Sequence, residues 1–229
     1  MRLFWWNTVP NLGDVLTRLL LEHYGHEVEW ASPAEAEFVG TGSVLEHFDR
    51  SAVTLWGTGR AGRTAPLTDL SGARVLALRG IHTLALVRGS TVDVLGDPGL
   101  LVTDIVPPPD KRYGTEQVVA IVPHWQDRDR ARATYPSCEF VDVMGDPVQA
   151  ITQIAHADRV VSSSLHGLVL ADAYGLPRMW DWFDGVQGHG FKFGDYFSVM
   201  GECEPGQWKQ SPRALAVKEE LRDCLGVMV

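Results

Sequence analysis

The chain has 229 residues, enough to bury a substantial core as one large domain or as two smaller ones. Its formal net charge of −9 argues against nucleic acid and anionic membrane surfaces as main partners. The three cysteines are few and widely spaced, as in reduced cytoplasmic proteins rather than in disulfide frameworks or zinc sites. No apolar run approaches the roughly 20 residues that a membrane-spanning helix needs, so we expect a cytoplasmic protein without a membrane span.

The first elements predict the opening of an α/β unit. Residues 2–6 have the pattern of a buried strand, a polar loop with the letters NLGD follows at 11–14, and residues 15–24 carry apolar side chains at helical spacing. Open α/β sheets bind ligands at loops of this kind, which follow the carboxyl ends of strands. Asp14 therefore has two interpretations, as an acid that favours the helix N-terminus or as a catalytic carboxylate that faces a cleft.

The next strands end in glycine-rich turns or in an arginine. Residues 37–39 and 52–56 are predicted strands, and each leads into a Gly-Thr-Gly turn that lets a backbone approach a ligand closely. The glycine spacing matches neither a dinucleotide fingerprint nor a P-loop. A strand at 74–80 carries Arg79 at its end, and this guanidinium suits a bound carboxylate or phosphate, or else a neighbouring acid. Residues 92–102 are predicted to form the last strand and turn of this half.

A proline-rich segment separates this series from a second one. Three successive prolines at 107–109 interrupt any strand or helix and predict a semi-rigid linker over residues 106–115. The second series has predicted strands at 117–124, 139–143 and 179–180, and predicted helices at 147–156 and 212–224. We therefore expect an α/β protein of two facing Rossmann-like domains, residues 1–105 and 116–229, with a ligand cleft between them.

The stretch 160–177, with the letters VVSSSLHGLVLADAYGLP, is the centre of the second series. It predicts a buried strand end, a turn of three serines and a helix that Gly175 and Pro177 terminate. His166 falls in the first turn of this helix, where free N–H groups and hydroxyls suit a phosphate or a carboxylate. The alternative is an ordinary strand-to-helix junction, in which one serine caps the helix and the histidine is half-buried.

Several short motifs follow one another from about residue 7 to residue 200. They are NLGD at 11–14, GTGS at 40–43, WGTG at 56–59, ALRG at 77–80, GDPG at 96–99, VPH at 122–124, FKF at 191–193 and DY at 195–196. Together with the long serine-histidine run at 162–177, this ordered set resembles the polysaccharide pyruvyl transferase family.

The resemblance implies a fold similar to that of the GT-B glycosyltransferases, with the acceptor on the first domain and the donor on the second. It also implies transfer of a pyruvyl group from phosphoenolpyruvate onto sugar hydroxyls of a glycan or glycan precursor, usually as a ketal, with release of phosphate. The partners would be this small-molecule donor and a sugar or glycan acceptor, with peripheral contact to membrane-bound precursors as one option. The scheme needs no cofactor and no metal, and no residue cluster has metal-ligand spacing.

Such chemistry needs cations for the donor, a general acid for its methylene carbon and a base for the sugar hydroxyl. The expected phosphoenolpyruvate contacts are Arg79, His124, Ser163, Ser164 and Lys192. The expected catalytic residues are His166, as acid or base, and Asp14, as the base on the acceptor side; His124 is an open alternative for the acid. The other expected acceptor-side residues are Asn11, Gly13, Gly42 and Gly59.

Two rival functions fit the same sequence. One is a nucleotide-sugar-dependent glycosyltransferase on the same scaffold, because a fold does not fix the chemistry. The other is a non-catalytic relative that binds a glycan or a phosphorylated metabolite. Binding of phosphoenolpyruvate but not of nucleotide sugars would exclude the first rival, and turnover would exclude the second.

Overall fold

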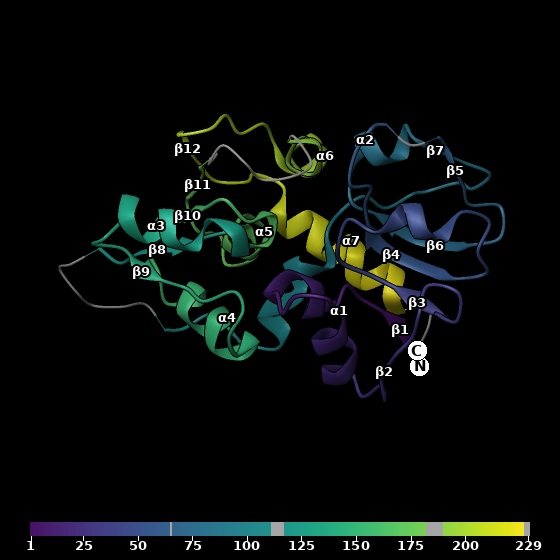
Figure 1. Ribbon diagram of the computed structural model, residues 1–229, viewed down its shortest axis with the longest axis horizontal. Coiled ribbons are helices and arrows are strands. Elements are labelled where there is room, and N and C mark those ends of the chain that lie inside the picture. Colours follow the sequence, from purple (N-terminus) through teal and green to yellow (C-terminus); the bar gives the residue numbers. More distant parts are fainter. Residues whose placement is uncertain (65, 111–116, 182–189, 227–229) are drawn as a thin grey trace.

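The computed structural model describes residues 1–64, 66–110, 117–181 and 190–226. It is a mixed α/β structure with two five-stranded sheets, which lie side by side (Figure 1). The elements of the first half are β1 (Arg2–Phe4), α1 (Leu12–His23), β2 (Glu29–Trp30), β3 (Phe38–Val39), η1 (Leu45–Phe48), β4 (Thr54–Thr58), β5 (Thr68–Asp69), β6 (Arg74–Leu78), α2 (Ile81–Leu84), β7 (Val87–Arg88) and the 3-10 helix η2 (Pro98–Asp104). Those of the second half are β8 (Val119–Val122), η3 (Trp125–Asp127), α3 (Arg128–Thr134), β9 (Glu139–Phe140), α4 (Pro147–Ala155), β10 (Arg159–Ser162), α5 (Leu165–Ala173), β11 (Arg178–Trp180), α6 (Phe191–Met200), β12 (Trp208–Lys209) and α7 (Ala214–Gly226).

The first sheet has the strand order β2-β1-β3-β4-β6, and all its neighbouring strands are parallel. Its first strand ends at Phe4, and Trp6, two residues further on, is 45% exposed. The predicted strand at 2–6 is therefore too long, because the chain leaves the sheet before the second tryptophan. The predicted helix at 15–24 is confirmed as α1, which begins earlier and covers the sheet with its buried leucines.

The second sheet has the order β12-β11-β10-β8-β9, with only the edge strand β12 antiparallel. Its central strand β10 is buried over Val160–Ser162 and leads through the serine turn into α5, every residue of which is buried. The strand, turn and helix predicted at 160–177 are thus confirmed. Because β8 and β10 are parallel neighbours, the loops after their carboxyl ends lie next to each other.

One segment differs from its prediction, and two helices were not predicted. Residues 92–102 form no regular strand: Leu95 makes an isolated bridge to Leu78, and η2 then begins because the Asp97 carboxylate accepts the Gly99 N–H at 2.9 Å. The aromatic segment at 191–197 had no predicted structure and belongs to the helix α6. The helix α3 was not predicted, because its polar sequence RDRARAT buries only Ala131.

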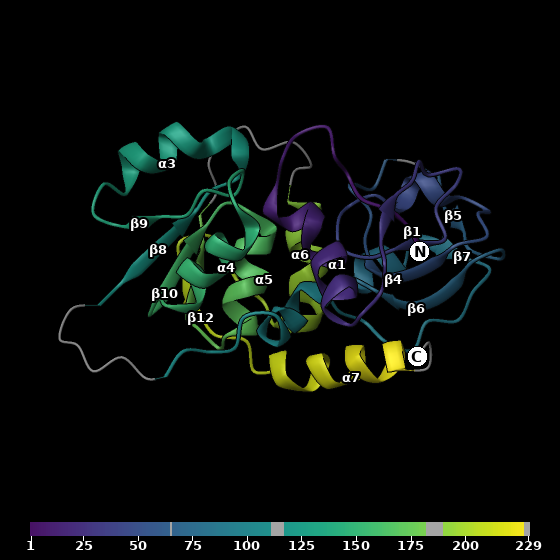
Figure 2. The same cartoon turned by 90° about the horizontal axis from the view of Figure 1, so that it is seen from below.

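The two halves share one hydrophobic core. A single cluster of buried side chains takes members from both sheets and includes Leu16 of α1, Leu100 of η2 and Val169 of α5. The last helix, α7, returns to the first half, where the Trp56 indole N–H donates to the carbonyl of Leu221 at 3.3 Å. Figure 2 shows α7 running from the junction of the two halves along the first half, with α1 and α6 between the sheets. Of the predicted linker, residues 111–115 lie outside the described residues, and 106–110 form no helix or strand.

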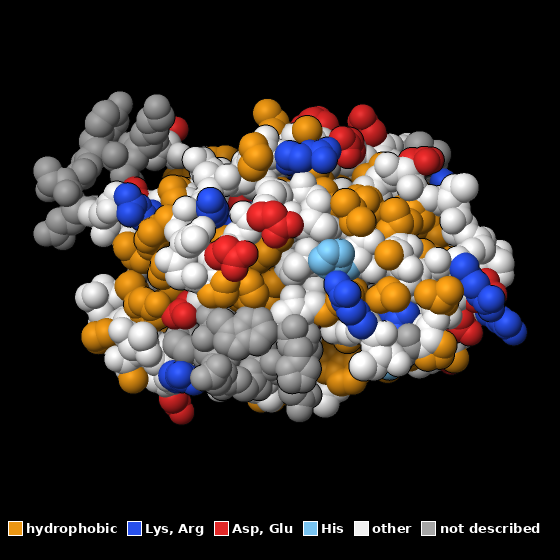
Figure 3. Space-filling model, turned by 90° about the horizontal axis from the view of Figure 1, so that it is seen from above, with side chains coloured by type: hydrophobic (Ala, Val, Ile, Leu, Met, Phe, Trp, Pro, Cys, Tyr) orange, Lys and Arg blue, Asp and Glu red, His pale blue; other side chains and the backbone are white. Residues whose placement is uncertain are grey.

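The surface carries charges of both signs. On the face drawn in Figure 3, Lys and Arg side chains are scattered among Asp and Glu rather than gathered into one tract. Within the described residues, no helix has both the length and the apolar character needed to cross a membrane.

Candidate active site

A cavity of about 460 Å³ opens between loops of the two halves. It brings together seven of the predicted site residues: Asn11, Asp14, Gly42, His124, Ser164, His166 and Lys192. The residues that line it without having been predicted are Trp6, Ser43, Val44, His47, Ala61, Trp125 and Leu165. The cavity therefore joins the loops that follow β1, β3, β8 and β10, as expected for parallel sheets.

Lys192 supplies a cation to this cavity from the first turn of α6. Burial lowers the pKa of its ammonium group to about 8, and the nearby Arg79 guanidinium acts in the same direction. The carboxylates of Asp14 and Asp127 oppose this shift. Since no hydrogen bond from Nζ occurs among the described residues, the ammonium is available to an anionic ligand.

His124 follows β8 and is held by its own backbone. Its N–H donates to Ser163 Oγ at 2.9 Å, and its Nδ1 lies 3.4 Å from the N–H of Gln126, from which it accepts. Burial, with a smaller contribution from Lys192, lowers the pKa of the imidazole to about 4. His124 is therefore neutral near pH 7 and offers Nε2–H as a donor, whereas a cationic partner for the donor's charges was predicted.

The serine turn is fixed by contacts among its own members and with nearby loops. Ser162 Oγ accepts the Ser164 N–H at 3.0 Å, and Ser163 Oγ donates to the Asp127 carboxylate at 2.8 Å. Ser164 occupies the N-cap of α5, but its side chain makes no capping hydrogen bond. A serine cap was one of the two interpretations of this turn, and it is wrong. The first turn of α5 thus reaches the cavity uncapped, while Ser163 shapes the turn without lining the cavity.

Asp14 faces the same cavity from the first turn of α1. Its carboxylate accepts a hydrogen bond from the Asn11 amide at 2.9 Å. Burial raises the pKa of this carboxyl group, and the Asn11 hydrogen bond, His166 and Lys192 partly oppose that effect. Because α1 belongs to the first half and Lys192 to the second, the acid and the cation come from different halves of the chain.

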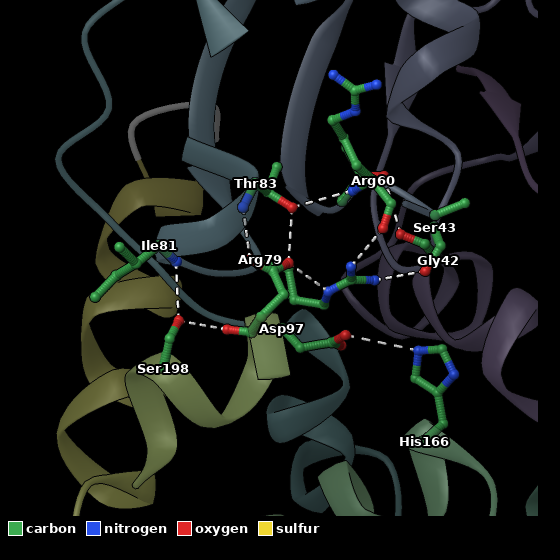
Figure 4. A network of polar contacts seen from close by, with 12 residues as sticks. Gly42, Ser43, Arg60, Arg79, Ile81, Thr83, Asp97, His166 and Ser198 are labelled. Atoms are coloured by element: carbon green, nitrogen blue, oxygen red, sulfur yellow. Dashed lines mark hydrogen bonds and ion pairs between the residues drawn. The ribbon is translucent and has the colours of Figure 1, made fainter. Parts of the chain in front are cut away.

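His166 is packed edge-on against the start of α1. It is 8% exposed, and a Cβ atom at Gly13 would lie only 1.8 Å from its Nδ1. Its Nε2 points inward, 3.6 Å from the Oδ2 atom of Asp97 (Figure 4). Gly13 therefore does not line the cavity; it provides the space in which the His166 ring lies.

Arg79 lies behind the cavity wall, in the buried network of Figure 4. Its Nε donates to the Asp195 carboxylate at 2.9 Å. One terminal nitrogen donates to Ser43 Oγ at 2.6 Å, and the other donates to the Arg60 carbonyl at 2.8 Å. Gly59 lies against it, and a Cβ there would approach the guanidinium carbon to 2.3 Å. Arg79 is not among the residues that line the cavity; it ties Ser43 to α6, and each of its three nitrogens donates one hydrogen bond to a protein oxygen.

Aromatic side chains form the part of the cavity wall that was not predicted. Trp6 stacks on His47, with ring centroids 6.2 Å apart and an interplanar angle of 26°, and Trp125 follows His124 on the opposite half. The sequence carries a signal for Trp6, since it is a large aromatic residue at the end of the predicted strand 2–6. It carries none for His47, which reaches the site only through the packing of η1. Within the described residues, no group of three or more His, Cys, Asp or Glu side chains is placed to hold a metal ion.

Comparisons with known proteins point to the same family as the motifs. The sequence model of the polysaccharide pyruvyl transferase family matches residues 70–180, which include Arg79, His124 and His166. Over 190 residues the chain is 30% identical to the uncharacterized protein L143 of Acanthamoeba polyphaga mimivirus. The match covers 76% of this chain and 63% of L143, so the chain spans less than two thirds of the length of L143. Over 235 residues it is 26% identical to the succinoglycan biosynthesis protein ExoV of Rhizobium meliloti (strain 1021), covering 96% of this chain and 71% of that protein. No solved structure matches the chain at a significant level. The predicted resemblance to the polysaccharide pyruvyl transferase family is confirmed.

Proposed function

We propose that this protein transfers the pyruvyl group of phosphoenolpyruvate onto two hydroxyls of a sugar in a glycan or glycan precursor, forming a ketal and releasing phosphate. The observation that carries the proposal is that Lys192, His124 and the α5 N-terminus, from the second half, line one cavity together with Asp14 from the first half. The first group suits an anionic donor, and the second suits a hydroxyl acceptor. The family match over residues 70–180 supports the same chemistry.

The reaction balances without an oxidant, a reductant or a cofactor. A proton adds to the methylene carbon of phosphoenolpyruvate, and the two sugar hydroxyls form bonds to the central carbon while its bond to the phosphate oxygen breaks. Of the two hydroxyl protons, one replaces the proton used at the methyl group and the other leaves with phosphate. The protein must therefore hold the donor's anionic groups and move protons between carbon and oxygen atoms.

We assign the donor to the wall formed by the second half. Lys192 would bind a carboxylate or phosphate oxygen as an ammonium, and His124 would donate Nε2–H as a neutral imidazole. The free N–H groups of α5 and the Ser164 hydroxyl would complete the anion site. Ser43 can also take part, because its oxygen accepts from Arg79 and its own proton remains available.

We assign the acceptor to the wall formed by the first half. Asp14 would take a hydroxyl proton, and the raised pKa of its buried carboxyl group makes it a stronger base than an exposed aspartate. Trp6 and His47 would hold a sugar ring, since the C–H groups of a sugar face match the negative face of an indole. In this arrangement the two sheets would act as the facing domains of a GT-B-like fold.

Ligand binding followed by turnover tests the proposal. Phosphoenolpyruvate should raise the melting temperature of the protein, whereas UDP-glucose and other nucleotide sugars should not. Phosphate release should then depend on an added sugar, measured across a panel of methyl hexosides and unpyruvylated glycans. Stabilisation by nucleotide sugars alone would favour the glycosyltransferase alternative, and donor binding without phosphate release from any acceptor would favour a non-catalytic relative.

A further inference from the structure

Two buried polar atoms face each other at the inner edge of the cavity. Asp97 is fully buried at the N-cap of η2, and its Oδ2 lies 3.6 Å from Nε2 of His166 (Figure 4). Neither atom has a hydrogen-bond partner within the part of the chain that the structure describes, and their 3.6 Å separation is longer than a hydrogen bond. Buried polar atoms are almost always paired, so this facing arrangement requires an explanation.

The orientation of the carboxylate is fixed independently of the histidine. Asp97 Oδ1 accepts the N–H of Gly99 at 2.9 Å, which leaves Oδ2 directed at the imidazole. A carboxylate oxygen only accepts hydrogen bonds, so a neutral imidazole is most stable with its single proton on the facing nitrogen. His166 is then protonated at Nε2, and its lone pair is on Nδ1.

The Nδ1 atom faces the start of α1. A Cβ at Gly13 would lie 1.8 Å from Nδ1, so any side chain at this position would displace the ring or cover this nitrogen. On either side of Gly13 in the sequence, Asn11 and Asp14 line the cavity. The absence of a side chain at Gly13 thus leaves Nδ1 on the side of the ring where the acceptor is expected.

We propose that Asp97 is a positioning residue, which holds His166 in the Nε2–H form so that Nδ1 is the nitrogen that exchanges a proton with the substrate. This inference rests on the proposed function, because it gives His166 its role there. When Nδ1 gains a proton, the ring becomes an imidazolium with an N–H toward Asp97; when Nδ1 gives the proton up, the starting form returns. Asp97 acts only as a hydrogen-bond acceptor throughout and touches no substrate.

The tautomer can be measured directly in the unaltered protein. Nitrogen NMR of histidine-labelled protein would identify the His166 signals as those missing from the His166→Gln variant. We expect a neutral ring with a protonated Nε2 and a bare Nδ1. The opposite tautomer would overturn the proposal, and this outcome does not depend on the protein having any enzymatic activity.

The Asp97→Asn variant tests the consequence for catalysis. Its amide oxygen can still accept from Gly99, while the amide nitrogen replaces the oxygen that faces His166 and favours the wrong tautomer. We expect kcat to fall about 10²–10⁴-fold with little change in the KM for phosphoenolpyruvate, together with an inverted NMR tautomer. Asp104→Asn is the matched control, since Asp104 lies in the same 3-10 helix and pairs with Arg222 away from the cavity.

The pH profile separates positioning from folding. The charged or titratable groups around His166 are Asp97 on its inner side and Asp14, His124, His47 and Lys192 around the cavity. Asp97→Asn should change the pH profile of kcat in the same limb that His166→Gln changes and leave the rest of the profile in place. A folded Asp97→Asn protein with kcat within a few-fold of the wild type and an unchanged profile would overturn the proposal. If the wild type itself released no phosphate, the proposed function would fail and the NMR result would still decide the tautomer.

Discussion

The chain holds two neighbouring polar clusters that differ in how the protein satisfies them. Around Arg79, every guanidinium nitrogen donates to a protein oxygen, and the Asp195 carboxylate also accepts from the N–H and hydroxyl of Thr83. Around Lys192, the cavity brings together the Lys192 ammonium, the uncapped N-terminus of α5 and the Asp14 carboxyl group, whose pKa is raised. These groups have few hydrogen-bond partners among the described residues. A satisfied cluster contributes to stability, whereas an unsatisfied one is suited to a ligand.

The largest effect should follow from removing the base of the open cavity. Asp14→Asn should lower the rate at saturating phosphoenolpyruvate about 10²–10⁴-fold, because general base catalysis has this magnitude. The free energy of unfolding of this variant should not fall, because burial already disfavours the charged form of the Asp14 carboxyl group. Steady-state phosphate release and urea unfolding measure the two quantities. A rate within a few-fold of the wild type would remove Asp14 from the mechanism.

In the satisfied cluster, the main loss should be in stability. Asp195→Asn leaves the fully buried Arg79 charge without its carboxylate and should reduce the free energy of unfolding by about 3–5 kcal/mol. The matched control is Asp142→Asn, which breaks the half-exposed pair with Arg128 and should cost below about 1 kcal/mol. Equal losses from the two variants, measured by urea unfolding, would contradict the distinction between the clusters.

Removing the cation of the cavity should weaken donor binding more modestly. Lys192→Met keeps most of the side-chain length and deletes a charge-assisted hydrogen bond of about 1.5–3 kcal/mol, so the affinity for phosphoenolpyruvate should fall roughly 10- to 100-fold. Calorimetric titration measures this, with the exposed Lys209→Met as control. An unchanged affinity would show that other groups bind the donor.

The smallest effect should be the pH dependence of donor binding. The Lys192 ammonium has a pKa of about 8, so the charged form dominates below this pH and is lost above it. The affinity for phosphoenolpyruvate should therefore fall as the pH rises through about 8. His124, with a pKa of about 4, should contribute no change in this range. Lys192→Met should abolish the dependence, and a slope that persists in that variant would assign it to another group.

The sequence predicted the second sheet and its central helix better than the polar network. The run at 160–177 contains its own strand, turn and helix signals, so local patterns were sufficient there. The protein partner of Arg79 could not be predicted in this way, because Asp195 lies 116 residues away in the sequence. The same limit applied to His47, which enters the cavity only through tertiary packing, and to η2, where the Asp97 cap replaced the expected strand.

The return of α7 to the first half has a consequence for synthesis of the chain. Trp56 and Gly96 lie against Leu221 and Val217 of this helix, so part of the first half stays uncovered until α7 has been made. More than a hundred residues separate Gly96 from α7. At a translation rate of about 5–20 residues per second, the ribosome needs roughly 5 to 25 seconds to synthesise them. During that interval the nascent first half exposes an apolar face that chaperones can bind, and a ribosome stalled before α7 would release a chain prone to aggregate.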